Sequence, residues 1–158
     1  MSVVDEVTEA NERYASGFDK GALPTPPARK LAVVTCMDAR LDPARFLGLE
    51  EGDAHVIRNA GGLVNDETIR SLVISHALLG TEEAIVIGHT GCGMLTFTND
   101  DVHAKLGPKS ESIDFEPFPD MAERVQQSVE TIRSHPLLPG FGVTGFVYDV
   151  ESGRIEPV

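Results

Sequence analysis

The chain has 158 residues, of which 41% are hydrophobic and 24% are charged, and these values are typical of one soluble globular domain. Its formal net charge of −12 argues against nucleic acid and anionic membrane as partners, because either would need a basic surface. No apolar run reaches the ~20 residues of a membrane helix, and the acidic, polar N-terminus does not resemble a signal peptide. We therefore expect a single domain over 1–158 in the cytoplasm.

Residues 1–29 are predicted to form a helix followed by an extended arm. Apolar side chains recur at helical spacing from Val4 to Phe18, and the sequence PTPP at 24–27 is stiff and extended. Such a segment holds a helix away from the core. We therefore expect this helix to pack on a neighbouring subunit, and packing on its own domain is the alternative.

The first and third strands of the core are predicted from short, continuous apolar runs, which are typical of parallel sheets covered on both faces. The predicted strands are 30–36, 54–59, 83–89 and 141–150, followed by a last short strand that ends at Pro157. Helices alternate with these strands, so the fold class is α/β. We expect a single domain with a mainly parallel central β-sheet flanked by helices, and an antiparallel hairpin at its C-terminal edge.

The helices are predicted mainly from their start and stop signals. Asp42 before Pro43 begins a helix that runs to about Leu49, and Asn65 begins a longer one that ends at Gly80. A third helix is predicted over 120–134 from its apolar spacing. Residues 99–119 show no clear period and are expected to form a loop with a short helical turn.

Two cysteines and one histidine are predicted to meet at one edge of the sheet. Cys36 ends the first strand, His89 ends the third, and Cys92 follows one turn later. Ligands of open α/β sheets bind beyond the carboxyl ends of the strands. Two thiolates and one imidazole suit zinc, and three protein ligands leave a fourth position open, as in catalytic sites. The alternative is a buried cysteine beside a hydrogen-bonded histidine.

Asp38 and Arg40 follow Cys36 at alternate positions, so their side chains can point the same way and form a pair. The guanidinium would keep Asp38 ionised. An ionised Asp38 beside zinc can accept a hydrogen bond from a zinc-bound hydroxide, or it can take the fourth metal position and close the site. The alternative is a surface ion pair worth ~0–1 kcal/mol.

Gly61 and Gly62 follow the second strand and are predicted to lie next to the same site. They could let the backbone approach a substrate. A tight turn before the next helix explains these two glycines equally well.

The motifs Cys36-x-Asp38-x-Arg40 and His89-x-x-Cys92 together resemble those of the β-class carbonic anhydrases, in particular the small bacterial type. The resemblance implies one Zn²⁺ per chain, held by the two cysteines and the histidine. It also implies that Asp38 and Arg40 form an orienting dyad, and that Asp38 binds zinc only in a closed, inactive state.

The stretch 55–61 between these motifs is similar to the second-strand stretch of the same family. The resemblance further implies a homodimer with the active site at the subunit interface, and pairing of dimers into tetramers in many members. The expected partners are therefore carbon dioxide, bicarbonate and a second copy of the chain.

The activity implied by the resemblance is that of a carbonate dehydratase, a zinc lyase that hydrates carbon dioxide reversibly to bicarbonate and a proton through a zinc-bound hydroxide. Two thiolates neutralise the metal charge, so its water should be less acidic than the pKa of about 7 found at tris-histidine zinc, and activity should climb through mildly alkaline pH.

Three alternative functions remain at this stage. The same zinc site could hydrolyse carbonyl sulfide or carbon disulfide, which are also linear molecules with an electrophilic carbon. The chain could be a non-catalytic, zinc-stabilised module that binds bicarbonate or a partner protein. A thiol redox protein is disfavoured, because Cys36 and Cys92 do not form a Cys-x-x-Cys motif.

Overall fold

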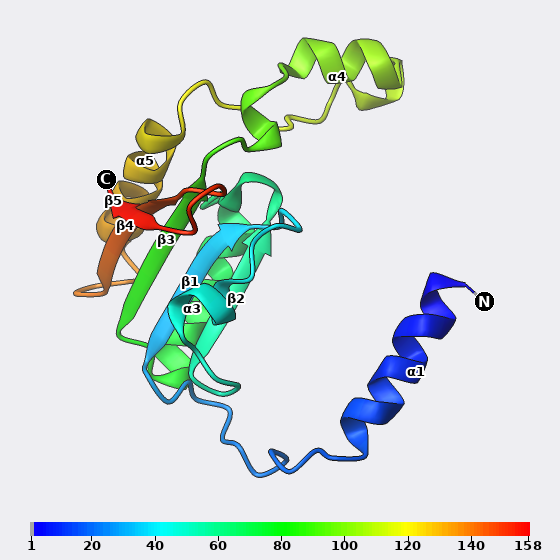
Figure 1. The fold of residues 1–158 in the computed structure, drawn as a ribbon. Coiled ribbons are helices and arrows are strands. Elements are labelled where there is room, and N and C mark those ends of the chain that lie inside the picture. Colours follow the sequence, from blue (N-terminus) through cyan, green and yellow to red (C-terminus); the bar gives the residue numbers. More distant parts are fainter. Residues whose placement is uncertain (1) are drawn as a thin grey trace.

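A five-stranded sheet with the order β2-β1-β3-β4-β5 lies at the centre of the computed structural model, which describes residues 2–158 (Figure 1). The strands are β1 (Leu31–Cys36), β2 (Ala54–Asn59), β3 (Glu83–His89), β4 (Gly142–Tyr148) and β5 (Ile155–Pro157). The first four are mutually parallel, and β5 pairs antiparallel with β4 at the edge. The predicted α/β fold class, with its C-terminal edge hairpin, is therefore confirmed.

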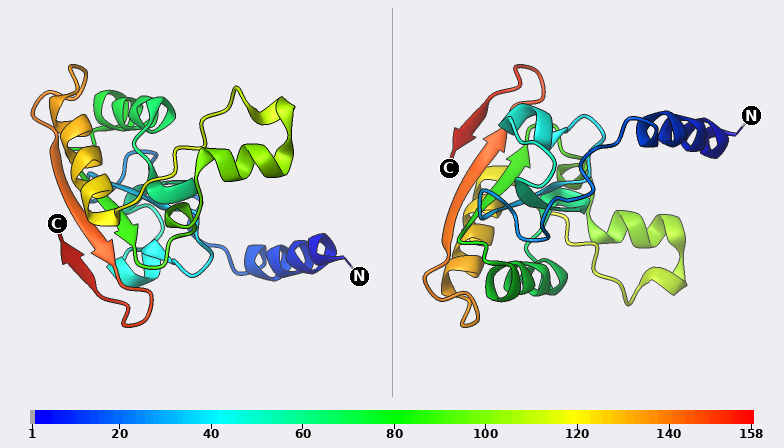
Figure 2. Two further views of the ribbon diagram at one scale, coloured as in Figure 1. Left: turned by 90° about the horizontal axis from the view of Figure 1, so that it is seen from above. Right: turned by 90° about the horizontal axis from the view of Figure 1, so that it is seen from below.

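Helices cover both faces of this sheet (Figures 1 and 2). The helices of the chain are α1 (Val3–Ala15), α2 (Pro43–Leu47), α3 (Asp66–Leu79), α4 (Asn99–Leu106) and α5 (Met121–Ser134), with 3₁₀ turns η1 (Ala60–Gly62), η2 (Gly93–Leu95) and η3 (Pro108–Ser110), and α2, α3 and α5 are the ones that cover the sheet. Helices α3 and α5 pack on one face, and α2 lies on the other, where Phe46 stacks on Tyr148 of β4 at 4.4 Å between ring centroids.

Two glycines let α5 approach the sheet closely. A Cβ atom on Gly88 of β3 would lie 2.3 Å from Met121 Sδ, and one on Gly145 of β4 would lie 2.7 Å from Val125 Cγ1. Side chains at these positions would push the helix outward. The absence of side chains there therefore sets the spacing between α5 and the strand that ends in His89.

The predicted caps explain where the helices of the core begin and end. The Asp42 side chain accepts a hydrogen bond from the Arg45 N–H, and the Asn65 side chain accepts one from the Thr68 N–H. Gly80 ends α3 in the left-handed conformation, with φ of 74°. These contacts satisfy backbone groups that the helices leave free at their ends.

The segment 99–119 differs from the prediction, because it contains the eight-residue helix α4 and not only a helical turn. Thr98 and Asp101 form a reciprocal capping box at its start. None of the described α4 side chains is buried, and its eight residues include only Val102 and Leu106 as large apolar side chains, which is too few to establish a helical period. Figure 1 shows α4 projecting from the body of the protein.

The N-terminal helix α1 stands away from the sheet (Figures 1 and 2). None of its described side chains is buried. Its base is tied to the body through Glu51, which accepts a hydrogen bond from Tyr14 Oη at 3.1 Å and pairs with Lys20. Across residues 2–158, no helix combines the length and apolar character that a membrane span requires.

Candidate metal centre

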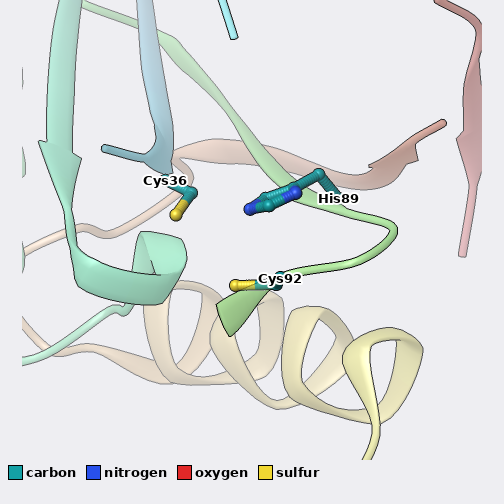
Figure 3. Close-up of side chains that lie close together, drawn as sticks. All are labelled: Cys36, His89 and Cys92. Carbon is teal, nitrogen blue, oxygen red and sulfur yellow. The ribbon is translucent and has the colours of Figure 1, made fainter. Parts of the chain in front are cut away.

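Cys36, His89 and Cys92 converge at the carboxyl-end rim of the sheet (Figure 3). Their metal-ligating atoms all lie within 4.8 Å of one another. The convergence follows from the strand order, because β1 and β3 are parallel neighbours that end at the same edge. The three residues are 5%, 0% and 1% exposed, so the cluster is shielded from bulk water.

One ring nitrogen of His89, Nε2, is free to bind a metal ion. Its Nδ1 lies 2.9 Å from the Thr90 carbonyl oxygen, which can only accept, so Nδ1 carries the proton. Nε2 is then a lone-pair acceptor, and it is buried without a hydrogen-bond partner among the described residues. Burial lowers the pKa of His89 and favours this neutral form. A metal ion at Nε2 would satisfy this unpartnered buried atom.

The two thiols complete a donor set that suits zinc. Sulfur and imidazole nitrogen are the ligands that zinc prefers in tetrahedral sites, and three of them leave one position open. Both cysteines are free, and burial raises the pKa of the Cys92 thiol to about 11 when no metal is present. Zinc, which needs thiolates, must therefore displace a proton from Cys92 at neutral pH.

This pKa makes zinc affinity depend on pH, with a definite sign. Below pH 11 the Cys92 thiol of the metal-free chain is protonated, so each unit of rising pH should tighten zinc binding by about tenfold through this group alone. We expect competition titrations against a chromophoric chelator, corrected for the chelator's own protonation, to show this increase between pH 6.5 and 8.5. An affinity that is flat over this range would contradict the assignment of Cys92 as a thiolate ligand.

Asp38 lies beside the cluster and is held by Arg40. Arg40 Nε donates to Asp38 Oδ1 at 3.0 Å, Arg40 Nη2 donates to Oδ2 at 2.7 Å, and the Arg40 backbone N–H donates to Oδ1 at 2.9 Å. The Arg40 guanidinium thereby holds the pKa of Asp38 well below its usual range. Asp38 Oδ2 lies 3.8 Å from His89 Nε2, so an ionised carboxylate faces the ligand group without forming part of it.

Arg40 also connects Asp38 to the segment that carries His89 and Cys92. Its Nη2 donates to the carbonyl oxygen of Gly91 at 2.9 Å, between His89 and Cys92. One guanidinium therefore links the segment at the end of β1, which carries Cys36 and Asp38, to the segment at the end of β3, which carries His89 and Cys92.

Gly61 and Gly62 lie in η1, buried against the end of β1. A Cβ atom on Gly62 would lie 2.9 Å from Thr35 C and 3.0 Å from Cys36 N, and the φ of Gly62 is +64°. A side chain would therefore displace the backbone at Cys36. The structure shows this packing role, and the predicted contact of the two glycines with substrate stays a prediction.

Sequence analysis assigned no role to Asn59 or Arg58, the last two residues of β2. The Asn59 side chain holds η1 in place: its Nδ2 donates to the Leu63 carbonyl at 2.9 Å, and its Oδ1 accepts from the Leu63 N–H at 2.6 Å. The only sequence signal for this function was the position of an asparagine between a strand and a glycine pair.

The fold and the site define an α/β metalloprotein whose buried ligand group has the composition of a zinc site. A family model described as carbonic anhydrase matches residues 31–114. Over an alignment of 162 residues the chain is 48% identical to beta-carbonic anhydrase 1 of Mycobacterium tuberculosis, covering 100% of this chain and 99% of that protein. The chain belongs to the β-carbonic anhydrase family.

Solved structures agree with this assignment. The carbonic anhydrase of Streptococcus mutans superposes with a TM-score of 0.93 at 43% identity, covering 100% of this chain and 98% of that one. A more distant relative is the carbon disulfide hydrolase of Acidianus sp., which is 35% identical over 97% of this chain and 87% of that protein.

Proposed function

We propose that this chain catalyses the reversible hydration of carbon dioxide to bicarbonate and a proton, with one Zn²⁺ held by Cys36, His89 and Cys92. The observation that carries the proposal is the buried Cys-His-Cys group, in which His89 Nε2 lacks a partner among the described residues and faces the ionised Asp38. Similarity to beta-carbonic anhydrase 1 over the full chain supports the same activity.

Each side chain has a distinct task in this reaction. When bound, zinc lowers the pKa of a water molecule and so supplies the nucleophile that attacks the carbon of carbon dioxide. Asp38 accepts the hydrogen bond of that nucleophile and orients its lone pair toward the substrate. Arg40 occupies both Asp38 oxygens, which keeps the carboxylate ionised and fixed in direction. This arrangement favours the open form of the site, in which Asp38 pairs with Arg40 and does not bind the metal.

The direct test is stopped-flow hydration of carbon dioxide with a pH indicator, on protein of known zinc content, at pH 7.5 and 8.5. We expect about one zinc per chain and rapid hydration, faster at the higher pH. Stoichiometric zinc without hydration at either pH would contradict the proposal and would favour a sulfur substrate or a binding role.

Carbon disulfide hydrolysis is the second candidate, because the relative of that name matches nearly the whole chain. The same site would present the same nucleophile to a linear molecule with an electrophilic carbon. Release of hydrogen sulfide into the headspace from carbon disulfide or carbonyl sulfide separates the two activities. The higher identity of the carbonic anhydrase relative favours carbon dioxide as the main substrate.

We also propose that the protein is a homodimer in which α1 of residues 1–29 packs on the partner subunit, and in which dimers can pair into tetramers. Val3, Val4 and Val7 lie on one side of α1 and form an apolar stripe. Their side chains are 73%, 69% and 60% exposed. A second copy would cover these apolar side chains, because α1 stands away from its own sheet (Figure 1) and none of its described side chains is buried.

Disrupting this apolar stripe should weaken the dimer. We expect the double variant Val4→Asp/Val7→Asp to elute closer to the 17.0 kDa monomer in size-exclusion chromatography with light scattering, at concentrations where the parent is dimeric. Arg13→Asp is the matched control, because it also lowers the charge by two but lies on another face of α1. A double variant as dimeric as this control would show that α1 does not form the interface.

A cytoplasmic location is consistent with the proposed zinc ligands. Cys36 and Cys92 are both free thiols in the structure, and both are needed as thiolates by the metal. Reducing compartments preserve such thiols, whereas oxidising compartments promote disulfides. We therefore propose that the enzyme functions in the cytoplasm.

A further inference from the structure

Arg58, the penultimate residue of β2, reaches across to the segment that follows β1. Its Nε donates a hydrogen bond to the carbonyl oxygen of Cys36 at 2.9 Å, and its Nη2 donates one to the carbonyl oxygen of Asp38 at 2.8 Å. One guanidinium therefore bridges the backbone of a proposed zinc ligand and the backbone of the proposed dyad.

Few other hydrogen bonds tie the bridged segment to the neighbouring strand β2. The pairing of β1 with β2 ends at Cys36 and Asn59, and one further hydrogen bond runs from the Met37 N–H to the Asn59 carbonyl at 2.8 Å. The Met37 side chain is 65% exposed and cannot anchor the turn by packing. The Asp38 carbonyl also accepts a hydrogen bond from the Leu41 N–H at 3.0 Å, and Arg40 Nη2 donates to the Gly91 carbonyl. The hydrogen bonds from the end of β2 are those that tie the chain directly after Cys36 to a neighbouring strand.

Among the described residues, the Arg58 guanidinium contacts backbone carbonyl groups and not a carboxylate. Within residues 2–158, no carboxylate oxygen lies within 4.0 Å of it, whereas Arg70 and Arg133 each pair with a glutamate on their own helix. Arginine suits the task because its planar fork presents two N–H donors at a fixed separation. A lysine ammonium in the same place could not reproduce this two-point geometry.

We propose that Arg58 is a positioning residue of the metal centre, which holds the Cys36–Asp38 backbone so that the Cys36 thiolate and the Asp38 carboxylate face the same metal position. The inference rests on the proposed function only for the identity of the metal. Residues that orient metal ligands through hydrogen bonds typically change metal affinity or activity by about 10- to 100-fold when replaced.

The test compares Arg58→Gln and Arg58→Lys with the parent and with Arg133→Gln. Arg133 is the matched control because it is an exposed arginine of α5 that pairs only with Glu130 among the described residues. Three readouts are needed: zinc affinity by chelator competition, the visible absorption of the cobalt-substituted protein, and kcat and KM for hydration. Circular dichroism and thermal melting check that each variant is folded.

We expect Arg58→Gln to weaken zinc binding by about 10- to 100-fold, to shift the cobalt bands, and to lower kcat more than it raises KM. Arg58→Lys should be impaired in the same direction, because it keeps the charge but loses one of the two hydrogen bonds, and it carries the test if the glutamine variant does not fold. The Arg133→Gln control should match the parent in all three readouts.

Two results would overturn the inference. The first is an Arg58→Gln variant with the zinc affinity, cobalt spectrum and kcat of the parent. The second is an Arg58→Lys variant that is fully active and binds zinc normally, which would show that charge and not the fork is required. Because affinity and spectrum need no turnover, a parent without hydration activity would refute the proposed function and still leave this inference testable.

Discussion

Replacing Cys92 with alanine is expected to remove both stoichiometric zinc and the hydration of carbon dioxide. Zinc bound by four ligands in small proteins is held by about 10–16 kcal/mol, so one ligand accounts for roughly 3 kcal/mol, or more than a hundredfold in affinity. The remaining pair of Cys36 and His89 cannot enclose the metal. Hydration, which requires the metal, should fall to the uncatalysed rate.

The measurement is metal content by mass spectrometry together with stopped-flow hydration. Cys92→Ser should show the same loss, because it preserves the volume of the buried side chain but replaces sulfur with a poor zinc ligand. Ser128→Ala is the control for altering a buried side chain, since Ser128 lies in α5 and does not belong to the ligand group. Full zinc and full activity in Cys92→Ala would exclude this residue as a ligand.

Replacing Asp38 with asparagine or alanine is expected to leave zinc in place and to lower kcat by about 10²-fold, the loss typical of misplacing a reacting group. Zinc should stay because Asp38 is not one of the three clustered ligands. The rate should fall because an asparagine amide is uncharged and offers one acceptor oxygen in place of two. It therefore cannot accept both Arg40 hydrogen bonds that hold the Asp38 side chain in place.

Asp53→Asn is the matched control for Asp38→Asn. Asp53 also pairs with an arginine, Arg29, at 3.5 Å, and its side chain is 21% exposed against 18% for Asp38. Similar losses in both variants would point to a general effect of breaking a carboxylate–arginine pair. Unchanged turnover in Asp38→Asn would restrict Asp38 to a structural role.

The sequence by itself determined most of the elements and the ligand group. The apolar runs at β1 and β3 predict strands because buried parallel strands have no polar face. Cys36 and His89 each end such a strand, and parallel strands of one sheet end at a common edge. Helix α4 was not predicted, because Val102 and Leu106 are the only large apolar side chains in its eight residues and give no recognisable helical period.

Only the tertiary structure decided how these parts meet. The order β2-β1-β3 makes β1 and β3 neighbours, and no sequence period specifies which strands pair. The same order places β2 beside β1, where Arg58 reaches the carbonyls of Cys36 and Asp38. Hydrophobic periodicity indicates which side chains are buried. A hydrogen bond instead depends on the positions of two atoms, and here the fold brings together atoms of strands that are far apart in the chain.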